Sequence, residues 1–166
     1  MREILFRGKA AEDEEFFNVK QGQWLYGSLF IDEFNNQVFI ENSKQEDIIT
    51  IDVNPETVGQ YTGLKDKNGT KIYEGDIVRI ENNDNYIRYI VYSGVRCSFI
   101  TMKYCDQLES HEMCRLGEYS EHEIEVIGNI HDNPELLGGV KSGTLACYCS
   151  YCSCRRCRYC NRIFDT

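Results

Sequence analysis

The residues with the clearest capacity for chemistry are cysteines, and six of the nine crowd the end of the chain. They are Cys147, Cys149, Cys152, Cys154, Cys157 and Cys160. Cysteines two residues apart suit the bidentate capture of zinc by thiolates. Only Ser153 separates the pair Cys149/Cys152 from the pair Cys154/Cys157, so two such pairs have too little chain between them to face each other around one metal ion. A looser cluster that holds several Zn ions is one hypothesis for these cysteines.

The segment that carries these cysteines, residues 141–166 (the tail), is also compositionally distinct. It holds five basic residues and one acidic residue, and Gly138-Gly139 and Ser142-Gly143 read as a flexible linker. We therefore divide the chain into a domain over residues 1–140 and a basic tail for which disorder is one expectation. An appendage without metal is the competing interpretation, whereas a disulfide framework is disfavoured in a reducing compartment.

A second group of metal-ligand residue types lies further upstream. Cys105, His111, Cys114 and His122 share one region, but their order matches no recognised zinc spacing, so buried thiols and surface histidines are the expected outcome. No P-loop, dinucleotide glycine fingerprint or Gly-x-Ser-x-Gly elbow is present. We expect no catalytic motif and no cofactor other than Zn on the tail. A hydrolase whose carboxylate site is assembled only by the fold stays open, because Asp and Glu are abundant.

The charge distribution bears on possible partners. The whole chain has a net charge of −9, and residues 1–140 hold 13 basic and 26 acidic residues, a net charge of −13. An acidic body disfavours phosphate binding, which depends on Lys and Arg, although a nucleic-acid- or nucleotide-binding barrel stays open as an alternative. The chain lacks an apolar run long enough for a bilayer and an apolar signal core, so a cytoplasmic protein without a membrane partner is expected.

Hydrophobic residues alternate with period two over much of the chain, which predicts short strands. The predicted strands are 4–7, 24–31, 38–40, 48–51, 77–80, 86–92, 95–103 and 124–130. Residues 106–116 are the one weak helix candidate. Short strands at this spacing predict a mainly β fold, either a compact antiparallel sheet or a small SH3-like barrel.

Turn residues punctuate these strands. Asn54-Pro-Glu-Thr-Val-Gly59 and Asn133-Pro-Glu-Leu-Leu-Gly138 each combine an Asn cap, a Pro suited to the first helical position and a terminal Gly, which predicts two single helical turns. Lys65–Thr70 reads as a hairpin tip in which Asn68 and Gly69 would both have positive φ. Gly75-Asp76 then opens the strand 77–80.

Three segments carry a recognisable pattern: Arg2-Glu-Ile-Leu-Phe-Arg7, residues 57–78 (Thr-Val-Gly-Gln-Tyr-Thr-Gly-Leu through Gly-Asp-Ile-Val), and Val126-Ile-Gly-Asn-Ile-His-Asp-Asn-Pro-Glu-Leu-Leu137. In this order they resemble the YopX family of phage and prophage proteins. The resemblance covers most of residues 1–140. It implies a β-rich, self-associating phage accessory protein in a bacterial host, without established catalytic residues.

The resulting functional hypothesis is a non-enzymatic interaction module, a homo-oligomer that acts on a host or phage protein. In one version of this hypothesis the partner is a host defence protein. The residues on which recognition could rest are Tyr61, Lys65, Asp66, Lys67 and Lys71, of which the four charged ones are expected to be exposed. Aromatic residues on adjacent predicted strands at 86–104 have two interpretations, a stacking platform for bases or cross-strand packing in a core and subunit interface.

Overall fold

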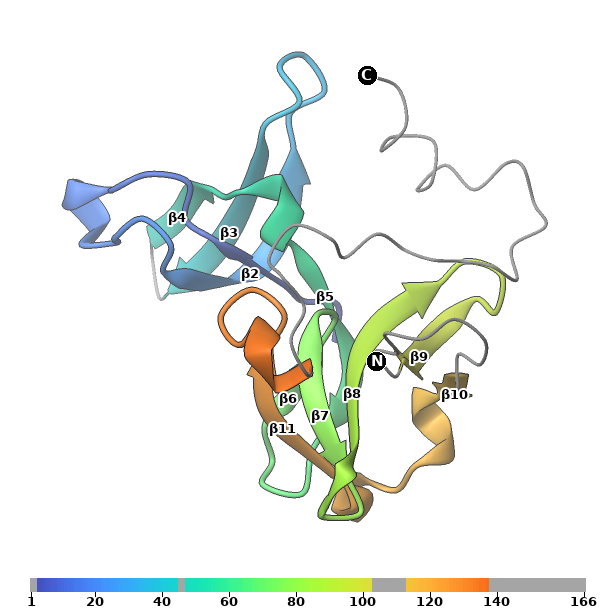
Figure 1. Cartoon of the computed structure of the whole chain (residues 1–166). Helices are drawn as coiled ribbons and strands as arrows, with labels where there is room; N and C mark the ends of the chain where they lie inside the picture. Colours follow the sequence, from blue (N-terminus) through green and yellow to red (C-terminus); the bar gives the residue numbers. More distant parts are fainter. Residues whose placement is uncertain (1–2, 45–46, 103–112, 138–166) are drawn as a thin grey trace, which may run out of the picture.

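The computed structural model describes residues 3–44, 47–102 and 113–137, which form eleven strands and five single turns of 3₁₀ helix (Figure 1). The strands make two antiparallel sheets, one with the order β4-β3-β2-β1-β5-β6 and one with the order β10-β9-β8-β7-β11. The predicted mainly β class is therefore confirmed. Among the described residues, no helix is long and apolar enough to cross a membrane.

The first sheet is built around a long hairpin. Its strands are β1 (Phe6–Lys9), β2 (Trp24–Ile31), β3 (Val38–Lys44), β4 (Asp47–Asp52), β5 (Gly59–Lys65) and β6 (Lys71–Tyr73). Leu29 pairs with Ile40 and Ile40 with Ile51, so these side chains share one face of the sheet. Ile51 packs there with Val19 and Ala10 in a small core. Phe30 pairs with Phe39, and their side chains lie on the opposite face of the sheet.

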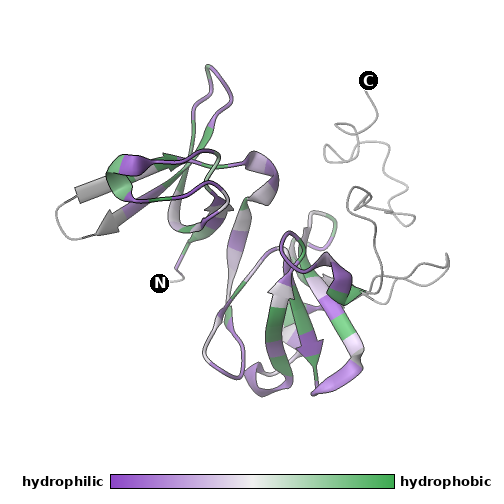
Figure 2. Cartoon of the chain, turned by 60° about the vertical axis from the view of Figure 1, so that its left-hand side comes forward, coloured by the Kyte–Doolittle hydropathy of each residue, from purple (hydrophilic) through white to green (hydrophobic). Residues whose placement is uncertain are grey.

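The second sheet holds the larger core. Its strands are β7 (Asp76–Ile80), β8 (Asn83–Ser93), β9 (Ser98–Met102), β10 (Met113–Arg115) and β11 (Ile124–Asn129). Figure 2 shows hydrophobic residues concentrated on these strands and hydrophilic residues in the turns between them. Val78, Ile90 and Ile124 form the centre of the core, and Ile72 of β6 joins them. The end of the first sheet thus packs on the second.

Both predicted helical turns are confirmed. Pro55–Thr57 forms the 3₁₀ turn η2, and the Asn54 side chain accepts a hydrogen bond from the backbone N–H of Glu56 at 3.1 Å. Pro134–Leu137 forms the second predicted turn, η5. Three further turns had no such signal: η1 (Glu15–Phe17), η3 (Leu116–Glu118) and η4 (Glu121–Glu123).

The hairpin tip between β5 and β6 differs from its prediction. Gly69 has φ of +80°, but Asn68 lies outside the positive-φ region. The cause is Asp66, whose carboxylate accepts hydrogen bonds from the backbone N–H groups of Asn68 at 2.9 Å and Thr70 at 2.8 Å. This side chain closes a longer loop in which a single residue needs positive φ.

Several predicted elements also differ from the structure in their bounds or type; for example, the strand predicted over 95–103 is found at Ser98–Met102. The first strand was predicted over 4–7 and is found at Phe6–Lys9. The described end of the weak helix candidate, 113–116, is strand β10 followed by the start of η3, because Met113–Arg115 pairs with β9 across the sheet. Residues 106–112 and the tail lie outside the described residues, as does the predicted boundary at 140/141.

Candidate functional site between the two sheets

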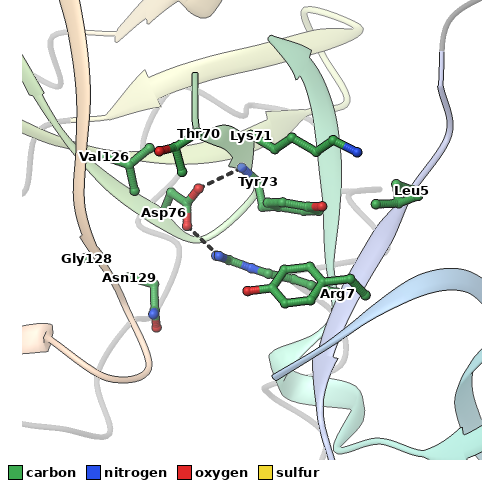
Figure 3. A pocket seen from close by; sticks show the side chains of 10 residues that line it. Leu5, Arg7, Thr70, Lys71, Tyr73, Asp76, Val126, Gly128 and Asn129 are labelled. Carbon is green, nitrogen blue, oxygen red and sulfur yellow. Dashed lines mark hydrogen bonds and ion pairs between the residues drawn. The ribbon is translucent and has the colours of Figure 1, made fainter. Parts of the chain in front are cut away.

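A pocket of about 510 Å³ lies where the two sheets meet (Figure 3). Arg7 of β1 and Tyr26 of β2 reach it from the first sheet, and Asp76 of β7 reaches it from the second. Lys71 and Tyr73 of β6 complete the part of the wall that bears charge or hydroxyl groups. The site is therefore composed of segments that are far apart in the sequence.

A buried ion pair crosses the pocket floor. The Arg7 Nη1 atom lies 2.6 Å from Asp76 Oδ1, and both side chains are almost fully buried. The second carboxylate oxygen of Asp76 accepts the backbone N–H of Tyr73 at 2.7 Å (Figure 3). Arg7 Nη2 donates to the carbonyl of Glu74 at 3.0 Å. The guanidinium also lies 4.6 Å from the ring centroid of Trp24 and 5.1 Å from that of Tyr73. These contacts fasten β1 to β7.

A second polar contact joins the sheets beside the pocket. The Asp132 carboxylate accepts hydrogen bonds from Trp24 Nε1 at 2.6 Å and Asn129 Nδ2 at 2.8 Å, and it pairs with the ammonium group of Lys9. Partial burial acts to raise the pKa of Asp132, but the hydrogen bonds from Lys9, Asn129 and Trp24 outweigh it and lower the pKa to about 2. Asp132 thus stays ionised and holds the turn after β11 against β1 and β2.

Asp76 has the opposite shift. Burial raises the pKa of Asp76 to about 6, although the charge of Arg7 and the N–H of Tyr73 favour the ionised form. Both oxygens of this carboxylate are occupied by donors from the protein itself. A general acid or base has to reach a substrate proton, so the geometry favours a structural role for Asp76 over a catalytic one.

The raised pKa of Asp76 predicts a specific pH dependence of stability. Between its unfolded value of 3.8 and its folded value of about 6, the folded state binds more protons than the unfolded state. Lowering the pH from about 7 to about 4 should therefore increase the free energy of unfolding of the wild type relative to that of Asp76→Asn. Urea unfolding of both chains across this range measures the difference.

The contributions of other titratable groups cancel when the wild type is compared with Asp76→Asn. Burial, with help from the charges of Arg7 and Lys9, lowers the pKa of His131, so protonation of His131 destabilises the fold in the same pH range. His131 is present in both chains, and its contribution cancels in the difference. Parallel pH profiles of the wild type and Asp76→Asn would contradict the assigned titration.

The five residues predicted for recognition do not form one group. Lys71 Nζ lies 5.3 Å from the ring centroid of Tyr61, so these two are in contact, and Lys71 lines the pocket. Lys65 pairs with Lys71 across the β5–β6 hairpin and is exposed. Lys67 is exposed but reaches away to β11, where its Nζ lies 3.1 Å from a carboxylate oxygen of Glu125.

The expectation that Asp66 is exposed is wrong, because only 3% of its surface is accessible. Besides the two N–H groups of its own hairpin tip, it accepts the backbone N–H of Val126 at 3.0 Å. Burial acts to raise the pKa of Asp66, and the three backbone hydrogen bonds lower it below its usual value. Asp66 is a structural residue that ties the hairpin to β11.

Sequence reasoning missed most of the residues that build the site. Arg7, Tyr73, Asp76 and Asp132 were not singled out for any role at a pocket. A signal was present, because these residues belong to the three segments that carry the family resemblance. The predicted aromatic cross-strand packing is found at Tyr92 and Phe99, whose rings meet edge to face at 5.4 Å.

The metal hypotheses receive no support from the part of the chain that the structure describes. Residues 3–44, 47–102 and 113–137 contain no group of three His, Cys, Asp or Glu side chains that could hold a metal ion. Cys114 is a half-buried free thiol, and His122 is exposed. Cys105, His111 and all six tail cysteines lie outside the described residues.

Comparison with known proteins places the chain in a family. Two similar solved structures are protein EF1440 from Enterococcus faecalis and protein yopX from Bacillus subtilis. EF1440 is 25% identical to this chain in sequence, with a TM-score of 0.46. The match covers 82% of this chain and 99% of the EF1440 chain. The yopX protein is 18% identical to this chain in sequence, with a TM-score of 0.48. The match covers 85% of this chain and 100% of the yopX chain. No curated protein matches the chain. The model of the YopX protein family matches residues 5–138, and the chain therefore belongs to the YopX family.

Proposed function

We propose that this chain is a non-enzymatic binding module that self-associates through the end of the β2–β3 hairpin. The observation that carries the proposal is an exposed apolar surface there. Phe34 in the turn is fully exposed, and Phe30 and Ile31 at the end of β2 are 53% and 49% exposed. Exposing three neighbouring large apolar side chains to water is unfavourable in free energy. An exposed apolar surface of this kind is typical of an interaction site.

The shape of the hairpin suits a second copy as its partner. Phe30 lies with its ring centroid 6.0 Å from that of Phe39 on one face, and the adjacent Ile31 points to the other face beside Val38. In a two-fold dimer the same patch covers itself, so each hairpin supplies the apolar surface that the other needs. The oligomer, rather than the monomer, would then meet a host or phage protein.

The electrostatics of the site support a binding role over an enzymatic one. Asp76 and Asp132 have the carboxylates with large pKa shifts, one raised and one lowered. Every oxygen of these two carboxylates contacts a donor from the protein itself. Their shifts have a structural explanation in contacts that fasten the sheets together.

Sedimentation velocity of hairpin variants tests the proposal. We expect the wild type to sediment as an oligomer and the double variant Phe30→Ser/Phe34→Ser to sediment as a monomer at the same concentration, because the apolar contact is lost. Val95→Ser is the matched control, since Val95 is 75% exposed on the turn between β8 and β9 and lies outside the hairpin.

Salt provides a second criterion. Two copies of an acidic body repel each other, and salt screens this repulsion while leaving apolar contacts in place. Association should therefore strengthen as salt is added. A monomeric wild type, or an oligomer that the double hairpin variant leaves intact, would refute self-association through the hairpin.

A further inference from the structure

Tyr26, Tyr73 and Lys71 line the pocket between the sheets, and Tyr61 packs against Tyr73 and Lys71. The ring centroid of Tyr73 lies 5.5 Å from those of both Tyr26 and Tyr61, and Lys71 Nζ lies 5.3 Å from the ring centroid of Tyr61. In Figure 3 the hydroxyl of Tyr73 and the ammonium of Lys71 extend in the same direction, toward Leu5, whereas Asp76 lies at the other end. This end of the pocket is rich in hydrogen-bond donors.

The hydroxyl of Tyr73 is the most informative of these donors. Only 4% of the residue is exposed, and its hydroxyl extends toward Leu5 along the pocket (Figure 3). A ligand with a negatively charged acceptor oxygen would give this hydroxyl a charge-assisted hydrogen bond. Burial, with a contribution from Tyr26, raises the pKa of Tyr73 to about 12, so the hydroxyl keeps its proton and can donate it.

The charged side chains at this end of the pocket indicate which chemical group of a ligand could bind there. The carboxylate of Glu3 lies 2.9 Å from Lys71 Nζ and is about half exposed, so a carboxylate from another molecule could replace it. The charge of Glu3 also contributes to the raised pKa of Tyr73, which places that carboxylate near the Tyr73 hydroxyl. Arg7 and Asp76 are engaged with each other and contribute no free charge.

We propose that this pocket binds a carboxylate carried on a small apolar or aromatic body. The ligand carboxylate accepts hydrogen bonds from Tyr73 and Lys71 in place of Glu3, and its body lies against Leu5 and the ring of Tyr26. The pocket volume of about 510 Å³ lies within the range of small-molecule sites. This inference goes beyond self-association and uses a different surface from the hairpin.

Titration with sodium benzoate, followed by NMR of the full chain, tests the proposal. Lys71→Met and Tyr73→Phe keep the packing of their side chains and remove one donor each, so each should weaken benzoate binding about tenfold. Glu3→Gln removes the internal competitor and should strengthen it. Lys65→Met is the matched control, an exposed lysine on the same hairpin, and should bind like the wild type.

The charge of the probe provides a further control. Benzylamine has a similar ring and the opposite charge, so it should leave the signals of the pocket residues unshifted. Equal binding of benzoate and benzylamine, unchanged benzoate affinity in Lys71→Met, or no benzoate binding at all would each overturn the proposal. None of these outcomes bears on the hairpin, because sedimentation of Lys71→Met reports self-association separately.

Discussion

Replacing Arg7 by methionine should lower the free energy of unfolding by about 3–5 kcal/mol, because the change leaves the carboxylate of Asp76 buried without its partner. Methionine retains much of the apolar volume, but the contacts of the guanidinium with the rings of Trp24 and Tyr73 are lost as well. For a chain of this size the melting temperature should fall by about 6–20 °C. Urea unfolding followed by tryptophan fluorescence measures the change.

The double variant Arg7→Met/Asp76→Asn separates the pair from its surroundings. Asparagine keeps an acceptor for the backbone N–H of Tyr73 and removes the buried charge, so the double variant should be more stable than Arg7→Met alone. A coupling energy of about 1 kcal/mol or more is expected from the double-mutant cycle. The cycle reports what the two side chains do together, which neither single variant can show.

Arg79→Met is the control with the same chemical change. Arg79 lies 2.9 Å from a carboxylate oxygen of Asp84, whose side chain is 81% exposed, and 3.3 Å from one of Glu125. Surface ion pairs contribute about 1 kcal/mol or less, so this variant should remain close to the wild type. If Arg7→Met cost no more than Arg79→Met, the pair with Asp76 would not be the link between the sheets that its geometry indicates.

The three segments that carry the family resemblance meet at this link. Arg7 comes from the first, Asp76 from the second and Asp132 from the third, and they hold the two sheets together. Each segment has local features that predict a strand, a turn or a cap; the two helical turns were confirmed, whereas the first strand and the hairpin tip differ in detail. The contacts that each segment makes with distant parts of the chain could not be predicted from local features. The hydrogen bond from Trp24 to Asp132, for example, spans 108 residues of sequence.

The difference between local and long-range information also explains the error at Asp66. A short run of lysines and an aspartate near an Asn-Gly pair is typical of an exposed tip, and Lys65 and Lys67 are indeed exposed. The Asp66 carboxylate is buried because backbone N–H groups converge on it, one of them from Val126 on a strand 60 residues away. Period-two patterns predict strands from neighbouring residues, but the identity of the paired strand is not written in them.

Gly27→Ala should have a comparably large effect, for a reason that no local pattern contains. A Cβ atom at Gly27 would lie 1.9 Å from the carbonyl oxygen of Glu41 on the neighbouring strand β3. This neighbour is backbone and cannot rotate away, so β2 and β3 would have to separate. Overpacking of this kind costs about 1–3 kcal/mol or more, and we expect the upper end because the hairpin pairing is disturbed as well.

Gly94→Ala is the matched control, since a Cβ atom there would have no neighbour within 4 Å and the residue lacks a positive φ. It should change the free energy of unfolding by no more than about 0.5 kcal/mol. Because Gly27 lies in the strand that ends in Phe30 and Ile31, Gly27→Ala should also reduce self-association, whereas Gly94→Ala should preserve it. Equal stability of the two variants would mean that β2 and β3 do not approach each other as closely at Gly27 as the structure shows, and the presentation of the hairpin would then need another explanation.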